Sequence, residues 1–419
     1  MSNPKKHSGL NMHISNDRIS MLFFLFLAFL YAVVCMTKNC FSSALAAIVS
    51  EGIMKKSQTG FITSAFYLVY GPLQIVGGIF ADKYNPEKLV KIGLAGSVIA
   101  NIIIFLNHNY YVMLGAWIFN GISQMALYPG MFKIITSQLS PEWRRKGIYY
   151  FSFTGTIGLM FGYIVAAFVT KWEYNFLISA VASLGLLVAL HMIYKSVSKH
   201  MVDDETPKIV KQDKKIEKVS TFKLFAISGF LFLLPVWLLR YMVDNSIKTF
   251  TPTMMVESYP NMSIMVSNLL NIFIIISGLL GIIIVRKFIF PRRIRNEVAA
   301  VILLIALTLP LTFVIKSTGK IDVWFIVAAM CLVSFLLSGA SLMTSFINGS
   351  FSKYGKNGTA AGLANSASSI GVVLQSYGFT YVADHFGWSA VTTIYVIGIS
   401  VCILFAACAY PLWRKYKNQ

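Results

Sequence analysis

Long apolar runs dominate this sequence. A helix needs about 20 apolar residues to cross a bilayer, and twelve runs reach that length. They lie at roughly 20–50, 57–80, 89–107, 110–137, 147–170, 174–196, 222–256, 262–287, 295–316, 321–350, 357–383 and 387–411. The runs are continuous rather than alternating, which excludes the strands of a transmembrane barrel. The first run lacks a small-residue cleavage site and is too long for a signal peptide, so we interpret it as a helix. The sequence therefore predicts an all-α integral membrane protein with twelve transmembrane helices.

The chain has few charged residues, but most of them are basic. Hydrophobic residues make up 56% of the chain and charged residues 12%, whereas about a quarter of a soluble domain is charged. If the chain starts in the cytoplasm, 27 of its 36 Lys and Arg face the cytoplasm, 5 face outward and 4 lie within spans. Cytoplasmic loops collect Lys and Arg, so the net charge of +20 is a topology signal rather than a nucleic-acid footprint. We expect both termini in the cytoplasm, a location in the cell membrane and no nucleic-acid partner.

One strongly polar stretch separates the sixth and seventh runs. Its composition is that of a solvated linker, and a regulatory or lipid-binding arm is the alternative. Two sets of six spans are the pattern of a transporter whose two bundles are related by a pseudo-two-fold axis. The predicted parts are a cytoplasmic N-terminal tail (1–19), an N-terminal six-helix bundle (20–196), a charged cytoplasmic linker (197–221), a C-terminal six-helix bundle (222–411) and a cytoplasmic C-terminal tail (412–419).

Two of the four cations within predicted spans lie near the middle of a helix, where a charge costs about 2.5–3.5 kcal/mol on insertion scales. Lys38 is in the first helix of the N-terminal half, and Arg240 is in the first helix of the C-terminal half. Their similar depth suggests two positive groups that face one cavity, which suits a small anionic solute. Lys38 has no acidic residue one turn away, so a pair with another helix is the alternative to a solute contact.

Arg240 has an acidic residue at i+4, Asp244. A structural ion pair between the two is the alternative to a solute-binding role, although both roles can coexist if Asp244 takes over the charge when the solute leaves. Lys248 continues the same helix face. It either takes part in coupling or extends to the membrane surface. We predict coupling or gating roles for Asp244 and Lys248.

Several uncharged polar side chains are candidates for lining the cavity. Tyr70 and Gln74 lie one turn apart on one face of the second helix, which favours a shared role. Polar residues in spans more often bond to a neighbouring helix than to a ligand, and that alternative applies to each of them. We predict solute contacts for Tyr67, Tyr70, Gln74, Gln124 and Asn365.

No motif in the sequence indicates catalysis or a bound cofactor. The five Cys lie in apolar runs without CxxC spacing, so we predict neither a metal site nor a disulfide framework. The sequence shows no nucleotide-binding motif, and transport would have to draw on an ion or exchange gradient. We expect no catalytic residue, no cofactor and no enzymatic activity, and we expect the protein to be a monomer in the lipid bilayer.

The turn after the second apolar run resembles a signature of the major facilitator superfamily. Residues 78–83 read Gly-Ile-Phe-Ala-Asp-Lys, which is similar to the family's Gly-x-x-x-Asp-Arg/Lys between helices 2 and 3. The resemblance implies the two-bundle fold of that superfamily. It also implies that Asp82 and Lys83 lock the inside gate.

Within that superfamily, nearly the whole chain resembles the organophosphate:inorganic phosphate antiporters. The family's Tyr-Gly in helix 2 is Tyr70-Gly71 here, and its Leu-Arg-Tyr in helix 7 is 239–241, followed by Asp244. In that family, one Arg on helix 1 and one on helix 7 hold the phosphate. The second corresponds to Arg240, whereas Lys38 stands in place of the first. Lysine supplies a cation but not a bidentate fork.

The leading hypothesis is a secondary active transporter that moves a small organic anion, such as a phosphorylated or carboxylated metabolite, by alternating access. One alternative is a transporter-like membrane sensor of such a solute, because some relatives of the phosphate antiporters signal through a partner. Another alternative is an exporter of a drug-like compound. An exporter would require a cluster of acids in the interior of the spans, where the sequence places only Asp244.

Overall fold

The computed structural model describes residues 12–151, 153–203, 220–289, 296–351, 354 and 356–418. The predicted N-terminal tail and the predicted linker fall largely on residues 1–11 and 204–219, which lie outside the described residues. The chain divides into two compact units. Unit 1 comprises Met1–Ala44 with Ala65–Lys211, and unit 2 comprises Leu45–Ser64 with Gln212–Gln419. The segment 45–64 thus groups with the C-terminal helices, although hydropathy alone assigns it to the N-terminal bundle.

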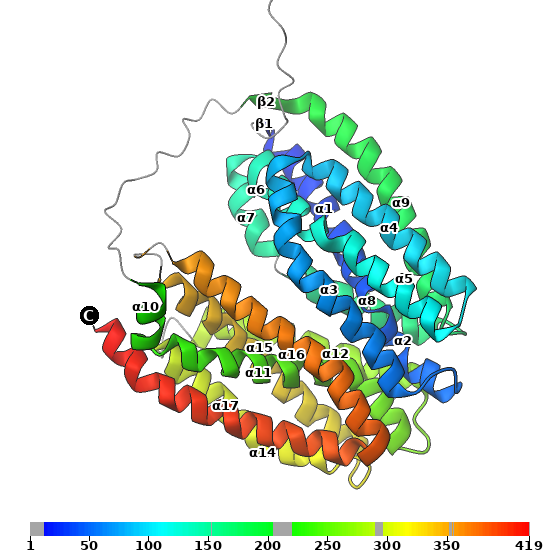
Figure 1. Cartoon of the computed structure of the whole chain (residues 1–419), viewed down its shortest axis with the longest axis vertical. Helices are drawn as coiled ribbons and strands as arrows, with labels where there is room; N and C mark the ends of the chain where they lie inside the picture. The colour runs from blue at the N-terminus through cyan, green and yellow to red at the C-terminus, as the bar shows by residue number, and fades with distance from the viewer. Residues whose placement is uncertain are drawn as a thin grey trace, which may run out of the picture. The chain divides into compact units, whose positions relative to one another are not determined.

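Unit 1 is built from helices of the N-terminal half of the chain (Figure 1). The helices that contribute to it are α1 (Asp17–Lys38), α2 (Cys40–Ser50), α3 (Lys56–Lys83), α4 (Pro86–Leu106), α5 (Tyr110–Ser123), α6 (Leu127–Gln138), α7 (Pro141–Phe151), α8 (Thr154–Phe168) and α9 (Tyr174–Val197). Helix α4 packs against α9 and α5, and α1 packs against α8 and α9. Two short strands, β1 (Met12–Ile14) and β2 (Met201–Asp203), pair antiparallel.

Asparagine side chains begin many of these helices. Asn16 accepts hydrogen bonds from the backbone N–H groups of two residues at the start of α1. Asn85 and Asn109 cap α4 and α5 in the same way, and Pro86 follows Asn85 at the first helical position. An Asn at this position satisfies backbone donors that have no partner inside the helix, and Pro there has no donor to satisfy. The polar breaks between the apolar runs thus stop one helix and start the next.

Unit 2 contains the helices of the C-terminal half (Figure 1). They are α10 (Thr221–Ile227), α11 (Phe230–Ser258), α12 (Ile264–Ile284), the π-helical turn η3 (Val285–Ile289), α14 (Glu297–Lys316), α15 (Val323–Gly349), α16 (Asn357–Phe386) and α17 (Trp388–Lys417). Helix α15 packs against α12 and α14, while α11 packs against α16 and α17.

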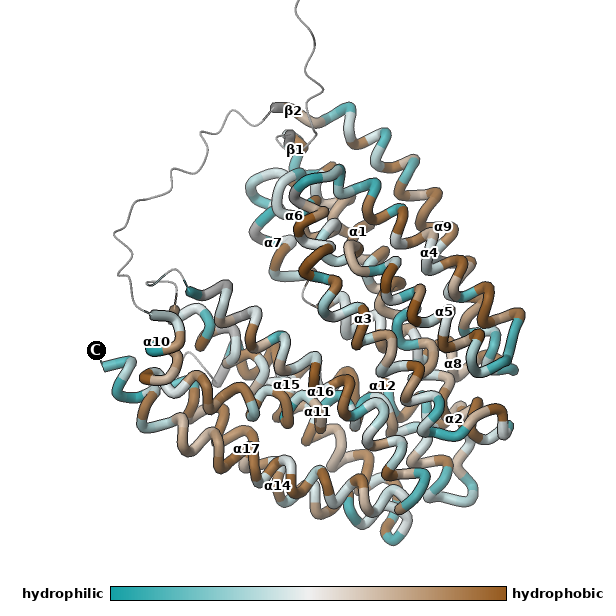
Figure 2. The backbone as a smooth tube through the Cα atoms, viewed as in Figure 1, coloured by the Kyte–Doolittle hydropathy of each residue, from teal (hydrophilic) through white to brown (hydrophobic). Residues whose placement is uncertain are grey.

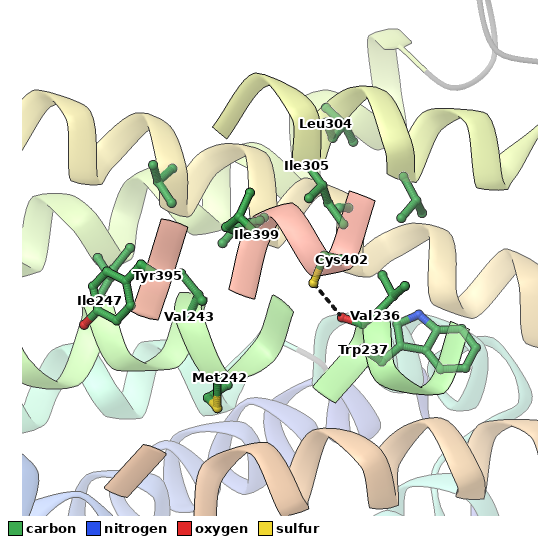
Figure 3. Packing of buried hydrophobic residues seen from close by; sticks show 14 of the residues in the cluster. Val236, Trp237, Met242, Val243, Ile247, Leu304, Ile305, Tyr395, Ile399 and Cys402 are labelled. Carbon is green, nitrogen blue, oxygen red and sulfur yellow. Dashed lines mark hydrogen bonds between the residues drawn. The ribbon is translucent and has the colours of Figure 1, made fainter. Parts of the chain in front are cut away.

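The core of unit 2 lies where α11, α14 and α17 meet (Figure 3). Val243 of α11 lies beside Ile399 of α17, and both side chains are buried, as is Trp237 of α11. The Cys402 thiol on α17 donates to the Val236 carbonyl oxygen at 3.7 Å. Burial of aliphatic and aromatic side chains between these helices stabilises the packing that holds α11 in place.

Nine helices in the described part of the chain are long and apolar enough to cross a membrane, or ten if the bent pair α7 and α8 forms one span. The all-α membrane fold is therefore confirmed, while the expected run at 110–137 is interrupted. The 3-10 turn Gln124–Ala126 divides it into α5 and α6, of 14 and 12 residues. The expected span at 357–383 forms α16, whose many Asn, Ser and Gly residues make it less apolar than its neighbours. Figure 2 shows apolar middles for α14 and α17 and a polar C-terminal end for α17.

A glycine sets the separation of α12 and α15. A Cβ atom at Gly281 would collide with the backbone of Phe335, because the two helices are in close contact there. We expect Gly281→Ala to destabilise the protein by about 1–3 kcal/mol through overpacking. Thermal unfolding in detergent, followed by Trp fluorescence, should give a lower midpoint than for the unaltered chain. Gly378→Ala is the control, because a Cβ there meets no atom within 4 Å. Equal midpoints for the two variants would contradict the close packing.

Candidate functional site

Lys38 is the last residue of α1. The helix breaks at Asn39, whose Nδ2 donates to the Cys35 carbonyl oxygen at 2.7 Å, and α2 begins at the next residue. The C-terminal end of a helix carries a partial negative charge and carbonyl groups without helical partners. This position stabilises a cation inside an apolar segment, and the Lys38 side chain there is only 6% exposed.

Tyrosines surround the Lys38 ammonium group. Its Nζ donates to the Tyr70 hydroxyl at 2.8 Å and lies 4.5 Å from the centroid of the Tyr70 ring. It also lies 5.2 Å from the centroid of the Tyr31 ring. A cation over a ring face gains about 2 kcal/mol when it is desolvated. Within the part of the chain that the structure describes, Lys38 forms no ion pair. The tyrosines thus stabilise the ammonium group without neutralising its charge.

Two further predicted residues lie on the helix that carries Tyr70. Tyr67 meets Tyr70 edge to face, with ring centroids 6.4 Å apart. Gln74 is half-buried one turn further along α3. The structure therefore brings Lys38, Tyr70 and Tyr67 into one cluster, with Gln74 next to it on α3.

The other predicted residues of unit 1 are Gln124, Asp82 and Lys83. Nε2 of Gln124 donates to Asn120 Oδ1 at 2.7 Å and to Ser97 Oγ at 3.0 Å. The amide nitrogen of Gln124 thus bonds within the bundle, whereas its buried Oε1 has no hydrogen-bond partner in the described structure, and a solute contact of Gln124 stays a prediction. Lys83 is exposed at the end of α3, and the side chain of Asp82 lies outside the described residues. A gating role for Asp82 and Lys83 stays a prediction.

Sequence reasoning missed Tyr31 and Tyr128. Tyr31 contacts the Lys38 charge directly, and its ring centroid is 5.5 Å from that of Tyr128 on α6. Tyr31 stands seven residues before Lys38, which places both on one face of a helix. That spacing is a signal for Tyr31, whereas the contact with Tyr128 depends on how α1 and α6 pack.

In unit 2, Arg240 lies inside α11 with only 4% of its surface exposed. Its Nη1 donates to the Leu337 carbonyl oxygen of α15 at 2.9 Å. Its Nε is buried and has no hydrogen-bond partner in the described structure. Arg240 forms no ion pair with any described carboxylate. The guanidinium is therefore anchored on one side and keeps an unused donor.

The pairing of Asp244 with Arg240, considered from the i+4 spacing, is wrong in this structure. Asp244 pairs with Lys248, whose Nζ lies 2.7 Å from Oδ1 and 2.8 Å from Oδ2. Lys248 Nζ also donates to Ser338 Oγ at 2.8 Å, and Ser338 Oγ lies 3.1 Å from Asp244 Oδ2 as a donor. Gly278 of α12 leaves room for the pair, because a Cβ there would be 3.1 Å from Lys248 Nζ. The Lys248 side chain thus lies between α11 and α15 within unit 2.

The backbone of Lys248 is held by a second contact. Pro252 inside α11 has no N–H group, so the carbonyl of Lys248, four residues earlier, loses its helical donor. Asn271 of α12 replaces that donor, with its Nδ2 2.7 Å from the Lys248 carbonyl oxygen. In an apolar bundle an unpaired carbonyl is costly. The Asn271 amide therefore satisfies the helix interruption that Pro252 creates.

The last predicted residue, Asn365, lies exposed on α16. It stays a predicted solute contact.

No group of three His, Cys, Asp or Glu within the described ranges is arranged to hold a metal ion. The cations of interest are thus Lys38 in unit 1 and Arg240 in unit 2, each described within its own unit.

The role of Asn271 can be tested with a double-mutant cycle. We expect Asn271→Leu to lower stability by about 1–3 kcal/mol, because it leaves the Lys248 carbonyl without a donor. In a Pro252→Ala background the backbone N–H of residue 252 supplies that donor, so the same substitution should cost less. The measurement is the thermal unfolding midpoint of the four proteins in detergent. Equal effects of Asn271→Leu in both backgrounds would show that the amide does not serve this carbonyl.

Comparison with known sequences gives a family-level match. The sequence profile of the Major Facilitator Superfamily matches residues 27–376. Among curated proteins, the membrane sensor protein UhpC of Escherichia coli is 26% identical over 113 residues, which are 27% of this chain and 25% of that protein. A probable hexose phosphate transport protein of Chlamydia trachomatis is 27% identical over 127 residues, 30% of this chain and 27% of that protein. This chain therefore spans about a quarter of the length of these two relatives.

Solved structures share the fold. A bacterial homolog of the human lysosomal transporter Spinster, in an inward-facing and occupied conformation, matches with a TM-score of 0.70 at 14% identity, over 96% of this chain and 98% of that chain. A D-xylose–proton symporter matches with a TM-score of 0.67 at 14% identity, over 93% of this chain and 97% of that chain. The superfamily predicted from residues 78–83 and from the apolar runs is confirmed. The chain is a multi-pass membrane protein that belongs to the Major Facilitator Superfamily of transporters.

Proposed function

We propose that the chain is a secondary active transporter of a small organic anion and that it works by alternating access. The observation that carries the proposal is the pair of buried cations, one in each unit. Lys38 contacts tyrosines, and Arg240 contacts a backbone carbonyl. Neither pairs with a described carboxylate.

The charge balance of unit 2 supports an anionic solute. Asp244 pairs with Lys248 at 2.7 Å and forms no ion pair with Arg240 in the described structure. An uncompensated buried charge is unfavourable, and polar groups kept inside membrane segments at such a cost usually serve function. A bound anion would supply the negative charge that Arg240 lacks in unit 2.

The two cations differ in what they offer to an anion. Lys38 acts as a point charge with one hydrogen bond already given to Tyr70. Arg240 has a buried Nε without a partner, so it can donate to a carboxylate or phosphate oxygen with directional geometry. Each of these cations, taken within its own unit, suits an anionic group of a solute.

Contacts at the start of α3 support alternating access. Within unit 2, Lys56 pairs with Glu257 of α11 at 2.9 Å and with Asp384 of α16 at 3.6 Å. The backbone N–H of Ser57 donates to Asp384 Oδ2 at 2.7 Å, and Ser64 Oγ donates to the Val373 carbonyl oxygen at 2.9 Å. A movement of α3 away from α16 would break these bonds. We call the ion pairs of Lys56 with Glu257 and Asp384 the latch. We propose that the latch stabilises one of the two end states of the transport cycle.

In the proposed topology the protein lies in the inner (plasma) membrane of the cell, and both termini are in the cytoplasm. The support is the excess of Lys and Arg in the loops on that side. Asp82 and Lys83 then lie at the cytoplasmic end of α3, where we propose that they take part in the inside gate. Transport would be driven by exchange of solutes or by an ion gradient.

A second candidate is a sensor that binds the same anion without moving it. It is favoured by one of the relatives, which is described as a membrane sensor protein. The two candidates differ in one measurement, since a sensor binds the solute but shows no flux into vesicles.

The anion site is tested by removing each cation. We expect Lys38→Gln and Arg240→Gln to lower the affinity for the transported anion by about 10- to 100-fold, because each removes a charge-assisted hydrogen bond. The measurement is binding to detergent-purified protein together with uptake into proteoliposomes loaded with organic carboxylates or phosphates. Lys171→Gln and Arg414→Gln are matched controls, since both side chains are exposed. The proposal fails if Lys38→Gln and Arg240→Gln retain both binding and uptake.

The latch is tested by removing its acids. We expect Glu257→Gln with Asp384→Asn to raise the rate of maleimide labelling of a cysteine placed at Ser64 by about 2- to 5-fold, because ion pairs of this kind contribute up to about 1 kcal/mol. The background carries Cys408→Ser, since Cys408 is the exposed cysteine of the described chain. Glu142→Gln, which breaks the exposed pair with Lys146 in unit 1, is the control. Unchanged labelling would contradict a latch.

A further inference from the structure

An aromatic cluster adjoins the Lys38 charge in unit 1. Tyr31 of α1 lies 4.8 Å, centroid to centroid, from Phe151 of α7. Tyr128 of α6 stacks with Phe151 at 5.8 Å and with Phe132 at 5.9 Å. We call Tyr31, Tyr128, Phe132 and Phe151 the aromatic platform. It brings four rings from three helices together next to a single ammonium group.

The platform leads from an accessible ring to the buried charge. Tyr128 is 38% exposed, whereas Tyr31 and Phe151 are buried. The centroid of Tyr31 lies 5.5 Å from that of Tyr128 and 5.2 Å from Lys38 Nζ. The rings of Tyr128 and Tyr31 therefore connect the exposed surface with the Lys38 ammonium group, and a ligand against Tyr128 lies close to a cation.

The chemistry of these groups discriminates between kinds of anion. Ring faces favour apolar and aromatic bodies, which gain about 0.5–1.5 kcal/mol from each aromatic pair beyond burial. A polyhydroxylated body needs several donors and acceptors to replace its water. Lys38 is surrounded by tyrosines, and no described amide or carboxylate side chain bonds to it. The surroundings of this cation suit a flat apolar body better than a sugar.

We propose that the transported solute is an aromatic organic anion, whose charged head contacts Lys38 and whose ring stacks on the platform at Tyr128. This inference rests on the proposed function, because it specifies the body of the anion that Lys38 binds. It departs from a sugar phosphate, since the specificity comes from ring stacking and not from bonds to hydroxyl groups.

The test compares anions that share a charged head group but differ in the body that carries it. Detergent-purified full-length protein is titrated with benzoate, gluconate, phenyl phosphate and glycerol 3-phosphate, and binding is measured by calorimetry or thermal shift. We expect the aromatic member of each head-group pair to bind about 2- to 10-fold more tightly than its polyhydroxylated partner. A preference for gluconate and glycerol 3-phosphate would overturn the aromatic assignment while leaving the anion transporter in place.

Variants of the exposed ring locate the preference. Tyr128→Leu is expected to bring the affinity ratio close to one, whereas Tyr128→Phe keeps a ring and is expected to retain the ratio. Tyr111→Leu is the control, because Tyr111 is 77% exposed on α5. An unchanged ratio in Tyr128→Leu would overturn the role of the platform. If that variant does not fold, the ratio of the unaltered protein still decides the inference. Binding of none of the four anions would instead overturn the proposed function itself.

Discussion

A charged side chain inside an apolar bundle needs a partner. The organisation of this protein depends on whether that partner is an opposite charge or a neutral group. In unit 2, Asp244 and Lys248 neutralise one another with the help of Ser338. Lys38 and Arg240 receive only neutral partners, a tyrosine hydroxyl and a backbone carbonyl. Neutral partners lower the cost of burial but leave the charge in place. The packing of each unit thus keeps one buried positive centre in place, Lys38 in unit 1 and Arg240 in unit 2.

The pairing of Asp244 shows what could be predicted from the sequence and what could not. The acid has a base one turn before it and another one turn after it, so spacing alone allowed either pair. An acid that precedes its base in the chain is the more favourable i,i+4 arrangement, and the structure contains that one. This rule could have selected Lys248 in advance. The hydrogen bond of Arg240 to Leu337 could not be predicted, because it depends on how α15 packs against α11.

The broad fold was predictable because apolar length and charge asymmetry act locally along the chain. Helix interruptions were not, since hydropathy averages over them. The break at Asn39 and the 3-10 turn at Gln124 fall inside continuous apolar runs. Tyr31 and Tyr128 were missed for a related reason, because aromatic residues in an apolar run look like ordinary core. Only the packing of α1 with α6 and α7 brings their rings together beside Lys38.

Lys248 combines two functions in one residue. Its side chain neutralises Asp244, and its carbonyl oxygen, freed by Pro252, is bound by Asn271 of α12. A proline within a helix is a point of bending. Bending of α11 at Pro252 would change the distance between α12 and the backbone that carries the Lys248 ammonium group. The position of a charge in unit 2 is therefore tied mechanically to the curvature of a helix, so that shape and electrostatic potential change together.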